Sequence, residues 1–151
     1  MAGKLRVLAI ASGGGHWIEL MRVRPAFDGH EVAWVSMFDN YASEVPGDRY
    51  YVVPDASRFD KLKMLAVFRK ALGILWRERP DAIVTTGSFP MLAFLLIGRL
   101  MGAKTLWIDS IAQAEEMSSS GKLAKKIAHK TVCQWPEVAQ AEGLECWGAV
   151  L

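Results

Sequence analysis

The sequence predicts a single α/β domain built around a parallel, doubly wound sheet, and three observations support this fold class. An apolar stretch at residues 5–11 runs into residues 12–16 (Ser-Gly-Gly-Gly-His) and then into an amphipathic pattern, which is typical of strand, tight turn and helix. Segments of strand and helix character then alternate to the end of the chain, as in parallel α/β sheets. The 151 residues suffice for one well-formed core and are short for two, so residues 1–151 are assigned to one domain.

The individual strands are predicted from short apolar or β-branched stretches, and the helices from apolar residues that recur every three or four positions. Strands are expected at residues 5–11, 31–36, 50–54, 81–85, 104–108 and 131–134. Helices are expected at residues 16–27, 60–79, 90–101, 122–129 and 136–141, the last followed by residues 144–147. Pro90 suits the first turn of its helix. Residues 118–121 (Ser-Ser-Ser-Gly) predict a mobile loop that caps the next helix.

The composition is that of a folded chain and argues against several classes of protein. Apolar residues make up 52% and charged residues 23%, which argues against disorder. A net charge of +2, without an aromatic RNA-binding motif or zinc-ligand spacing, argues against a nucleic-acid partner and a bound metal. Two cysteines, Cys133 and Cys146, are expected to be small core residues and indicate a reducing compartment.

The N-terminal stretch is not expected to direct export or to cross a membrane. Residues 1–11 predict a first strand and not a signal peptide, because their basic residues lead straight into the glycine turn. No stretch reaches the roughly 18–20 apolar residues that span a bilayer. A cytoplasmic location is therefore expected.

A ligand site is predicted where four loops meet at one edge of the sheet, since ligands bind outside the carboxyl ends of the strands in this fold class. The loops comprise residues 12–16, 86–89, 109–116 and 134–135. Glycines at positions 13–15 let backbone amides approach an anion, phosphate above all, and the start of a helix adds partial positive charge. His16 beside this turn can hydrogen-bond a ligand or take up a proton near neutral pH. The alternative is a turn that only packs, with His16 as its cap.

Polar residues in the other loops suit a sugar or phosphate ligand. Gly87 and Ser88 lie in a second amide-rich turn beside the first. Asp109, at the carboxyl end of a strand, can hold sugar hydroxyls or orient a histidine, and the alternative is that it caps the following turn. Glu115, in the same loop, is expected to be solvated. The dinucleotide fingerprint and the Walker pattern are both missing from the sequence, so no nucleotide cofactor is expected.

The long predicted helix at residues 60–79 has a wider apolar face than one sheet requires. At 100° per residue its apolar residues fill an arc of about 200°. They are Met64, Leu65, Val67, Phe68, Ala71, Leu72, Ile74, Leu75 and Trp76. The surplus can bury against a partner or rest in a lipid headgroup layer, where flanking basic residues meet anionic lipid. The alternative is an ordinary, well-buried helix.

Five motifs in a fixed order resemble those of a known family. They are Ser12-Gly13-Gly14-Gly15-His16 with Glu19, Arg79-Pro80-Asp81 leading to Thr86-Gly87, Ile108-Asp109-Ser110-Ile111, Ser118-Ser119-Ser120-Gly121-Lys122 and Gln134-Trp135-Pro136. The chain resembles the acceptor-binding, membrane-anchoring subunit family of the dolichol-linked, chitobiose-forming N-acetylglucosaminyltransferase, with its bacterial homologues in exopolysaccharide and capsule assembly. The glycine turn is also shared with the N-terminal half of the lipid-II-forming N-acetylglucosaminyltransferase.

This resemblance implies a single Rossmann-like domain equivalent to the N-terminal half of a GT-B glycosyltransferase. A separate chain would supply the half that binds the UDP-sugar, and this chain would bind a polyprenyl-diphosphate-linked sugar acceptor on the cytoplasmic face of the membrane. Eukaryotic subunits of the family carry an N-terminal transmembrane anchor, whereas this chain starts almost at its first strand. Peripheral attachment through the amphipathic surface or the partner is therefore expected, without a cofactor.

The same resemblance assigns roles to particular residues. The expected proton acceptor is His16, with Asp109 orienting it or the acceptor. The residues expected to bind the acceptor or its diphosphate are Ser12, Gly13, Gly14, Gly15, Glu19, Gly87, Ser88, Ser110 and Glu115. Those expected to contact the partner chain are Gln134, Trp135, Val150 and Leu151. Two alternatives stay open: a scaffold that activates a catalytic partner without chemistry of its own, and a stand-alone nucleotide-binding enzyme.

Overall fold

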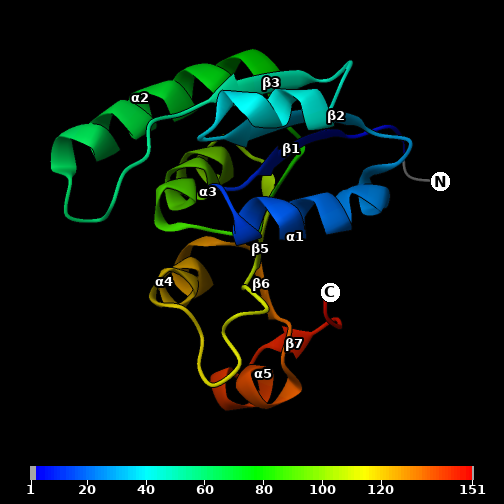
Figure 1. The fold of residues 1–151 in the computed structure, drawn as a ribbon, viewed down its shortest axis with the longest axis vertical. Coiled ribbons are helices and arrows are strands. Elements are labelled where there is room, and N and C mark those ends of the chain that lie inside the picture. The colour runs from blue at the N-terminus through cyan, green and yellow to red at the C-terminus, as the bar shows by residue number, and fades with distance from the viewer. Residues whose placement is uncertain (1–2, 151) are drawn as a thin grey trace.

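The structure, a computed structural model, describes residues 3–150 and confirms the predicted α/β fold (Figure 1). Within these residues seven strands form one sheet in the order β3-β2-β1-β4-β5-β6-β7, and all neighbouring strands are parallel. The strands are β1 (Arg6–Ile10), β2 (Glu31–Ser36), β3 (Arg49–Val52), β4 (Ala82–Thr85), β5 (Lys104–Ile108), β6 (Lys130–Cys133) and β7 (Glu145–Cys146). The α-helices are α1 (Gly15–Val23), α2 (Lys61–Glu78), α3 (Leu92–Leu100), α4 (Ser119–Ile127) and α5 (Pro136–Glu142). Short 3₁₀ helices are η1 (Arg24–Phe27), η2 (Asp39–Glu44) and η3 (Phe89–Met91).

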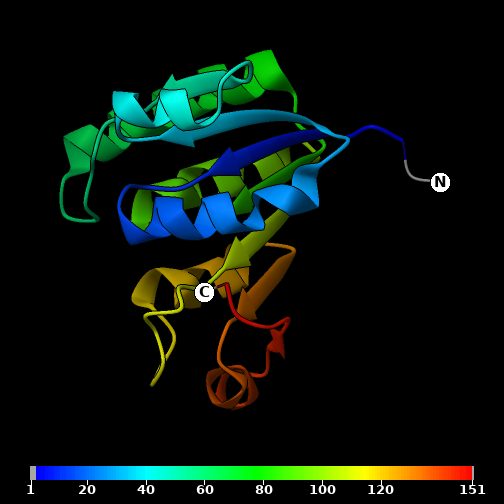
Figure 2. The same cartoon turned by 45° about the vertical axis from the view of Figure 1, so that its right-hand side comes forward.

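The sheet separates two apolar cores, because side chains of a strand alternate between its faces. Leu8 and Ile10 of β1 belong to the core that α2, α3 and α4 cover. Val7 and Ala9 belong to the core under α1 and η1. Figure 2 shows β1 in the middle of the sheet, with α1 on one side of it. The strand order changes direction between β1 and β4, and the loops after these two strands therefore meet at the edge where such folds bind ligands.

Two predicted helices begin or end as 3₁₀ turns, and both changes occur near a proline. The helix expected at residues 16–27 leaves α geometry after Val23 and continues as η1, which has Pro25 in its first turn. Proline lacks the N–H that an α-helix needs and collides with the preceding turn. The helix expected at residues 90–101 starts as η3 around Pro90 and becomes regular only at α3.

The prediction of a mobile loop at residues 118–121 is wrong, although the expected cap is present. The side-chain oxygen of Ser118 accepts a hydrogen bond from the amide of Gly121 at 2.9 Å, and α4 begins at Ser119. A serine N-cap satisfies a free amide of the first turn, so the stretch forms the start of the helix. The sequence reading also missed η2, which lies between β2 and β3.

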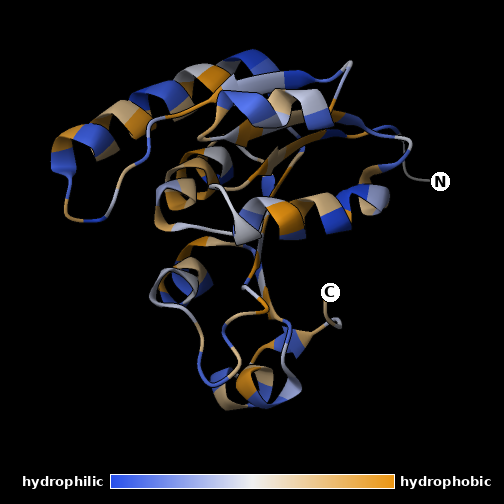
Figure 3. Cartoon of the chain, in the orientation of Figure 1, coloured by the Kyte–Doolittle hydropathy of each residue, from blue (hydrophilic) through white to orange (hydrophobic). Residues whose placement is uncertain are grey.

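Helix α2 contributes both core and exposed apolar residues. The residues of its apolar arc fall into a buried and an exposed group. The buried group, which lies in the core, comprises Val67, Ala71, Ile74 and Leu75. By contrast, Leu65, Leu72 and Trp76 are 58%, 53% and 64% exposed. Figure 3 shows hydrophobic and hydrophilic residues alternating along this helix. The predicted surplus of apolar surface is therefore present.

Candidate functional site

The glycine turn after β1 is shaped by contacts that need glycine. Gly14 has a φ of 60°, and its N–H donates to the hydroxyl of Tyr41 in η2 at 3.0 Å. A Cβ at Gly13 would overlap the ring of Phe38. Ser12 is buried, and its N–H donates to the carbonyl of Gly87 at 2.9 Å. The two glycine turns predicted to be neighbours are therefore hydrogen-bonded to each other.

His16 is held against the turn that follows β4. Its Nδ1 lies 2.9 Å from the carbonyl oxygen of Thr86, and the Thr86 hydroxyl donates to the His16 carbonyl at 2.6 Å. A carbonyl oxygen only accepts hydrogen bonds, so Nδ1 carries the proton and the Nε2 of the neutral ring is free to accept one. Gly87 has a φ of 120°, and a Cβ there would lie 2.6 Å from Nδ1. The close approach of this glycine thus fixes the ring.

A small cavity of about 100 Å³ opens beside His16 at the carboxyl edge of the sheet. Besides His16, its walls are formed by the loops after β4 and β5, the end of β5 and the start of α4: Thr86, Ser88, Trp107, Asp109, Ser110, Gln113, Ser118 and Ser120. Five of the nine lining residues carry a hydroxyl group, and those of Thr86, Ser110 and Ser118 donate hydrogen bonds within the protein. The cavity brings together His16, Ser88, Asp109 and Ser110 of the predicted site.

Asp109 uses both carboxylate oxygens to hold neighbouring groups. Oδ1 accepts from Trp107 Nε1 at 3.0 Å and from the hydroxyl of Ser118 at 2.6 Å, while Oδ2 accepts from the Ser118 amide at 2.9 Å. Within residues 3–150 it makes no hydrogen bond with His16. The geometry therefore favours the alternative in which Asp109 organises the start of α4, and its contact with an acceptor stays a prediction.

Two other predicted residues are buried and already engaged. The carboxylate of Glu19 in α1 accepts hydrogen bonds from Ser110, Ile111 and Gln134. Gln134 in turn accepts one from the backbone amide of Val150. A direct contact of Glu19 with an acceptor, or of Gln134 with a partner, would break these bonds. Their direct contacts with an acceptor and with a partner chain stay predictions.

The remaining predicted residues lie around the same edge. Trp135 is half-buried, and its Nε1 donates to the carbonyl of Ile111 at 2.7 Å. Glu115 is exposed and does not line the cavity, as expected for a solvated carboxylate. Leu151 lies outside the described residues.

The sequence reading left several wall and neighbouring residues out of the site. Trp107, Ser118 and Ser120 line the cavity but lie outside the predicted loops, and Thr86 lies in a predicted loop without an assigned role. Phe38, in the loop between β2 and η2, packs against the glycine turn at Gly13. The sequence signal that could have indicated Phe38 is an aromatic side chain just after the end of β2, in a loop of mostly polar residues.

The chemistry available near the cavity is that of proton transfer and hydrogen bonding. Burial raises the pKa of the Cys133 thiol to about 11, with nearby carboxylates adding to the shift, so this thiol is not a nucleophile at neutral pH. Among residues 3–150 no cluster of three or more His, Cys, Asp or Glu residues could hold a metal ion. Over the same range the helices are all too short or too polar to cross a bilayer.

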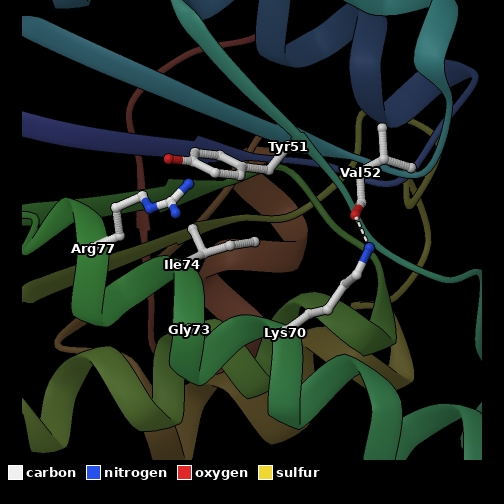
Figure 4. Close-up of a pocket in the computed structure, with 6 residues that line it drawn as sticks. All are labelled: Tyr51, Val52, Lys70, Gly73, Ile74 and Arg77. Carbon is white, nitrogen blue, oxygen red and sulfur yellow. Dashed lines mark hydrogen bonds between the residues drawn. The ribbon is translucent and has the colours of Figure 1, made fainter.

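A second and larger cleft, of about 310 Å³, lies between the edge strand β3 and α2 (Figure 4). Its walls are formed by Tyr51, Val52, Lys70, Gly73, Ile74 and Arg77. Lys70 donates to the carbonyl of Val52 at 2.9 Å, and the guanidinium of Arg77 lies at the other end of the cleft. This cleft shares no residue with the His16 cavity. Lys70 and Arg77 give this cleft a basic character.

The fold and the position of the cavity define a class: a Rossmann-like domain of the kind that forms one half of a GT-B protein. No protein-family model matches the chain. The chain is similar to the mouse (Mus musculus) UDP-N-acetylglucosamine transferase subunit ALG14, with 21% identity over 90% of this chain and 78% of that protein. This match confirms the resemblance predicted from the five motifs.

Solved structures of GT-B proteins are similar in fold. MurG of Acinetobacter baumannii superposes with a TM-score of 0.73 and 18% identity, covering 89% of this chain and 42% of MurG. The UDP-N-acetylglucosamine 2-epimerase of Rickettsia bellii gives a TM-score of 0.70 and 20% identity, covering 94% of this chain and 43% of the epimerase. At these identities the structures establish the fold alone. The chain thus spans less than half the length of the structures it resembles.

Proposed function

We propose that this chain is the acceptor-binding subunit of a two-component glycosyltransferase. The complete enzyme would transfer a sugar from a nucleotide-sugar donor, held by a partner chain, to a polyprenyl-diphosphate-linked acceptor held here. The observation that carries the proposal is the His16 cavity at the open edge of a domain that spans 42% of MurG. One such domain supplies one wall of a two-walled site. The similarity to a transferase subunit supports the same proposal, in which a partner chain holds the donor and this chain holds the acceptor.

In this proposal the acceptor diphosphate lies at the N-terminus of α1. The first amides of a helix have no partner within it, and the helix dipole favours negative charge there. Because the N–H of Gly14 is already bonded to Tyr41, the next amides of the first turn, those of Gly15 and His16, would bind the ligand. The hydroxyl of Ser88 in the cavity wall adds a donor for phosphate or sugar oxygens.

The proposed chemical step uses the free nitrogen of His16. Nε2 takes the proton of the acceptor hydroxyl while the hydroxyl oxygen attacks the anomeric carbon of the donor sugar. The bond from that carbon to the nucleotide diphosphate breaks, and the diphosphate leaves with the electron pair. The hydrogen bond from Nδ1 to Thr86 stabilises the imidazolium that forms and keeps the ring in place.

The isolated chain is expected to transfer no sugar, and transfer is expected when a donor-binding chain is added. The measurement is incorporation of label from UDP-N-acetylglucosamine into a polyprenyl-diphosphate-linked sugar, with each chain alone and with both together. A donor-binding chain encoded beside this one is the first partner to test. Robust turnover by the pure chain would overturn the two-component proposal and favour a stand-alone enzyme.

We further propose that the exposed stripe on α2 rests on the membrane surface. Leu65, Leu72 and Trp76 present apolar side chains to solvent, and the same helix carries Lys70 and Arg77 in the cleft of Figure 4. This combination suits the interfacial layer of a membrane with anionic lipids. The acceptor, which is lipid-linked, would then be presented at the same surface.

Leu72→Glu is expected to weaken binding to anionic vesicles roughly tenfold or more, because it withdraws a leucine from the apolar contact. Co-sedimentation with vesicles containing phosphatidylglycerol measures the effect, and wild-type binding should fall as salt rises. Ala141→Glu adds the same charge to an exposed position of α5 and is the matched control. Equal binding by Leu72→Glu and wild type would remove α2 as the membrane contact.

Ile74 belongs to the same predicted apolar arc as Leu72 but is unsuitable for this test. It is buried in the core, so Ile74→Glu would place a charge among apolar residues and unfold the domain.

A further inference from the structure

Glu19 is a buried carboxylate without a cationic partner among residues 3–150. It is 3% exposed, and three donors from two other segments satisfy it. Oε2 accepts from the hydroxyl of Ser110 at 3.0 Å, while Oε1 accepts from the amide of Ile111 and from Gln134 Nε2, both at 2.7 Å. Burial of a charge is costly unless it is fully hydrogen-bonded. These bonds hold the loop after β5 to α1.

Gln134, at the end of β6, joins this carboxylate to a third segment. It is 4% exposed, and its Nε2 donates both to Glu19 and to the carbonyl of Asp109, the latter at 3.0 Å. Its Oε1 accepts from the amide of Val150 at 2.7 Å. A carboxylate and a carbonyl require the amide nitrogen, and an N–H requires the amide oxygen, so the side chain has one orientation that satisfies all three partners.

The segment that contains Val150 is held by contacts at its end. After β7 the chain turns back toward α1, and residues 147–149 are exposed (Figure 1). Val150 donates to Gln134, and its carbonyl accepts from Arg22 of α1 at 3.3 Å. Because few hydrogen bonds hold this otherwise exposed segment, a partner chain could bind it or displace it at a low cost in free energy.

The loop held by Glu19 and Gln134 also forms a wall of the His16 cavity, through Asp109 and Ser110. We infer that Glu19 and Gln134 are positioning residues that couple the segment at residues 147–150 to this wall. Engagement of the segment by the donor-binding chain would then set where Ser110 and Asp109 meet the acceptor. The inference rests on the proposed function for its consequence in catalysis, but the coupling itself is a property of the chain.

Val150→Pro tests the coupling, because proline removes the N–H that Gln134 accepts from and changes nothing in the cavity. Hydrogen exchange of the Ile111 amide in the pure chain, followed by NMR, reports whether Glu19 still holds the loop. We expect exchange at Ile111 to become roughly tenfold faster. In the assembled transferase we expect kcat/KM for the lipid-linked acceptor to fall roughly 10–100-fold, with a smaller change in KM for the nucleotide sugar.

Ala149→Pro is the matched control, since it introduces proline one residue earlier, where the N–H donates to no group within residues 3–150. In the pure chain it should leave exchange at Ile111 at the wild-type rate. Gln134→Met removes the whole connection at similar volume and should exceed Val150→Pro in its effect on Ile111.

Exchange at Ile111 and acceptor kcat/KM that stay unchanged in Val150→Pro would overturn the inference, as would equal effects of the two proline variants on Ile111 exchange in the pure chain. If the wild-type pair of chains shows no transfer, the proposed function fails, and Ile111 exchange still decides whether the coupling exists.

Discussion

Replacing His16 by alanine should lower turnover of the assembled transferase by about 10²–10⁴-fold, the usual contribution of a general base. The reason is that Nδ1 is committed to the Thr86 carbonyl, so Nε2 is the ring nitrogen able to take up a proton in a residue that lines the cavity. The measurement is kcat for transfer to the lipid-linked acceptor, in parallel with a binding assay for the partner chain. Partner binding should be retained, because His16 is not part of the apolar core.

His16→Asn separates the chemical role from a structural one. The asparagine amide can donate to Thr86 as Nδ1 does, but it has no atom that takes up a proton. The alternative of a capping histidine is weakened by the structure, because Gly14 is the N-cap of α1 and no side chain caps this end. Loss of turnover in both variants supports His16 as the base. Near-normal turnover in His16→Asn would move the base to the partner chain and favour the scaffold alternative.

The sheet could be predicted from the sequence because its signals are local. β2 and β5 begin and end at the predicted residues, and the glycine turn after β1 lies at the expected edge. Alternation of strand and helix is enough to imply parallel pairing in such a chain. The start of α4 was missed because serine is frequent both in mobile loops and at N-caps, and the contact of Ser118 with Asp109 that decides between them spans nine positions.

The candidate site could be predicted in position but not in the role of each residue. Loops that follow parallel strands meet at one edge, so the neighbourhood of His16, Gly87 and Asp109 follows from topology. Whether a carboxylate faces the ligand or the protein depends on donors far away in the sequence. Glu19 bonds to residues 91, 92 and 115 positions further on. No periodicity in one sequence carries that information.

The same limit applies to the surface of α2. A helical arc gives the direction of each side chain relative to the axis, but not where the neighbouring elements end. Leu72 and Ile74 both belong to the apolar arc, yet one is exposed and the other is core. The boundary is set by how the sheet and α3 pack against the helix, and the sequence pattern alone does not record it.

Asp109→Ala should destabilise the domain by about 3 kcal/mol or more, since each buried donor left without a partner costs about 1–3 kcal/mol. Three donors lose their acceptor: Trp107 Nε1 and both the amide and hydroxyl of Ser118. Urea unfolding of the pure chain measures the effect, as a midpoint lowered by about 1–2 M at typical slopes. Asp55→Ala, which removes an exposed carboxylate, is the control and should change the midpoint little.

Asp109→Asn distinguishes the structural role of this residue from the orienting role first predicted for it. Asparagine keeps one oxygen, so it should retain part of the hydrogen bonding to Ser118 and Trp107 and unfold at a urea concentration between those of wild type and alanine. If Asp109 acts only by organising the start of α4, turnover of the assembled enzyme by Asp109→Asn should follow the fraction folded. A large loss of kcat in a fully folded Asp109→Asn variant would show instead that the carboxylate meets the acceptor. An unchanged midpoint in Asp109→Ala would contradict the structural role.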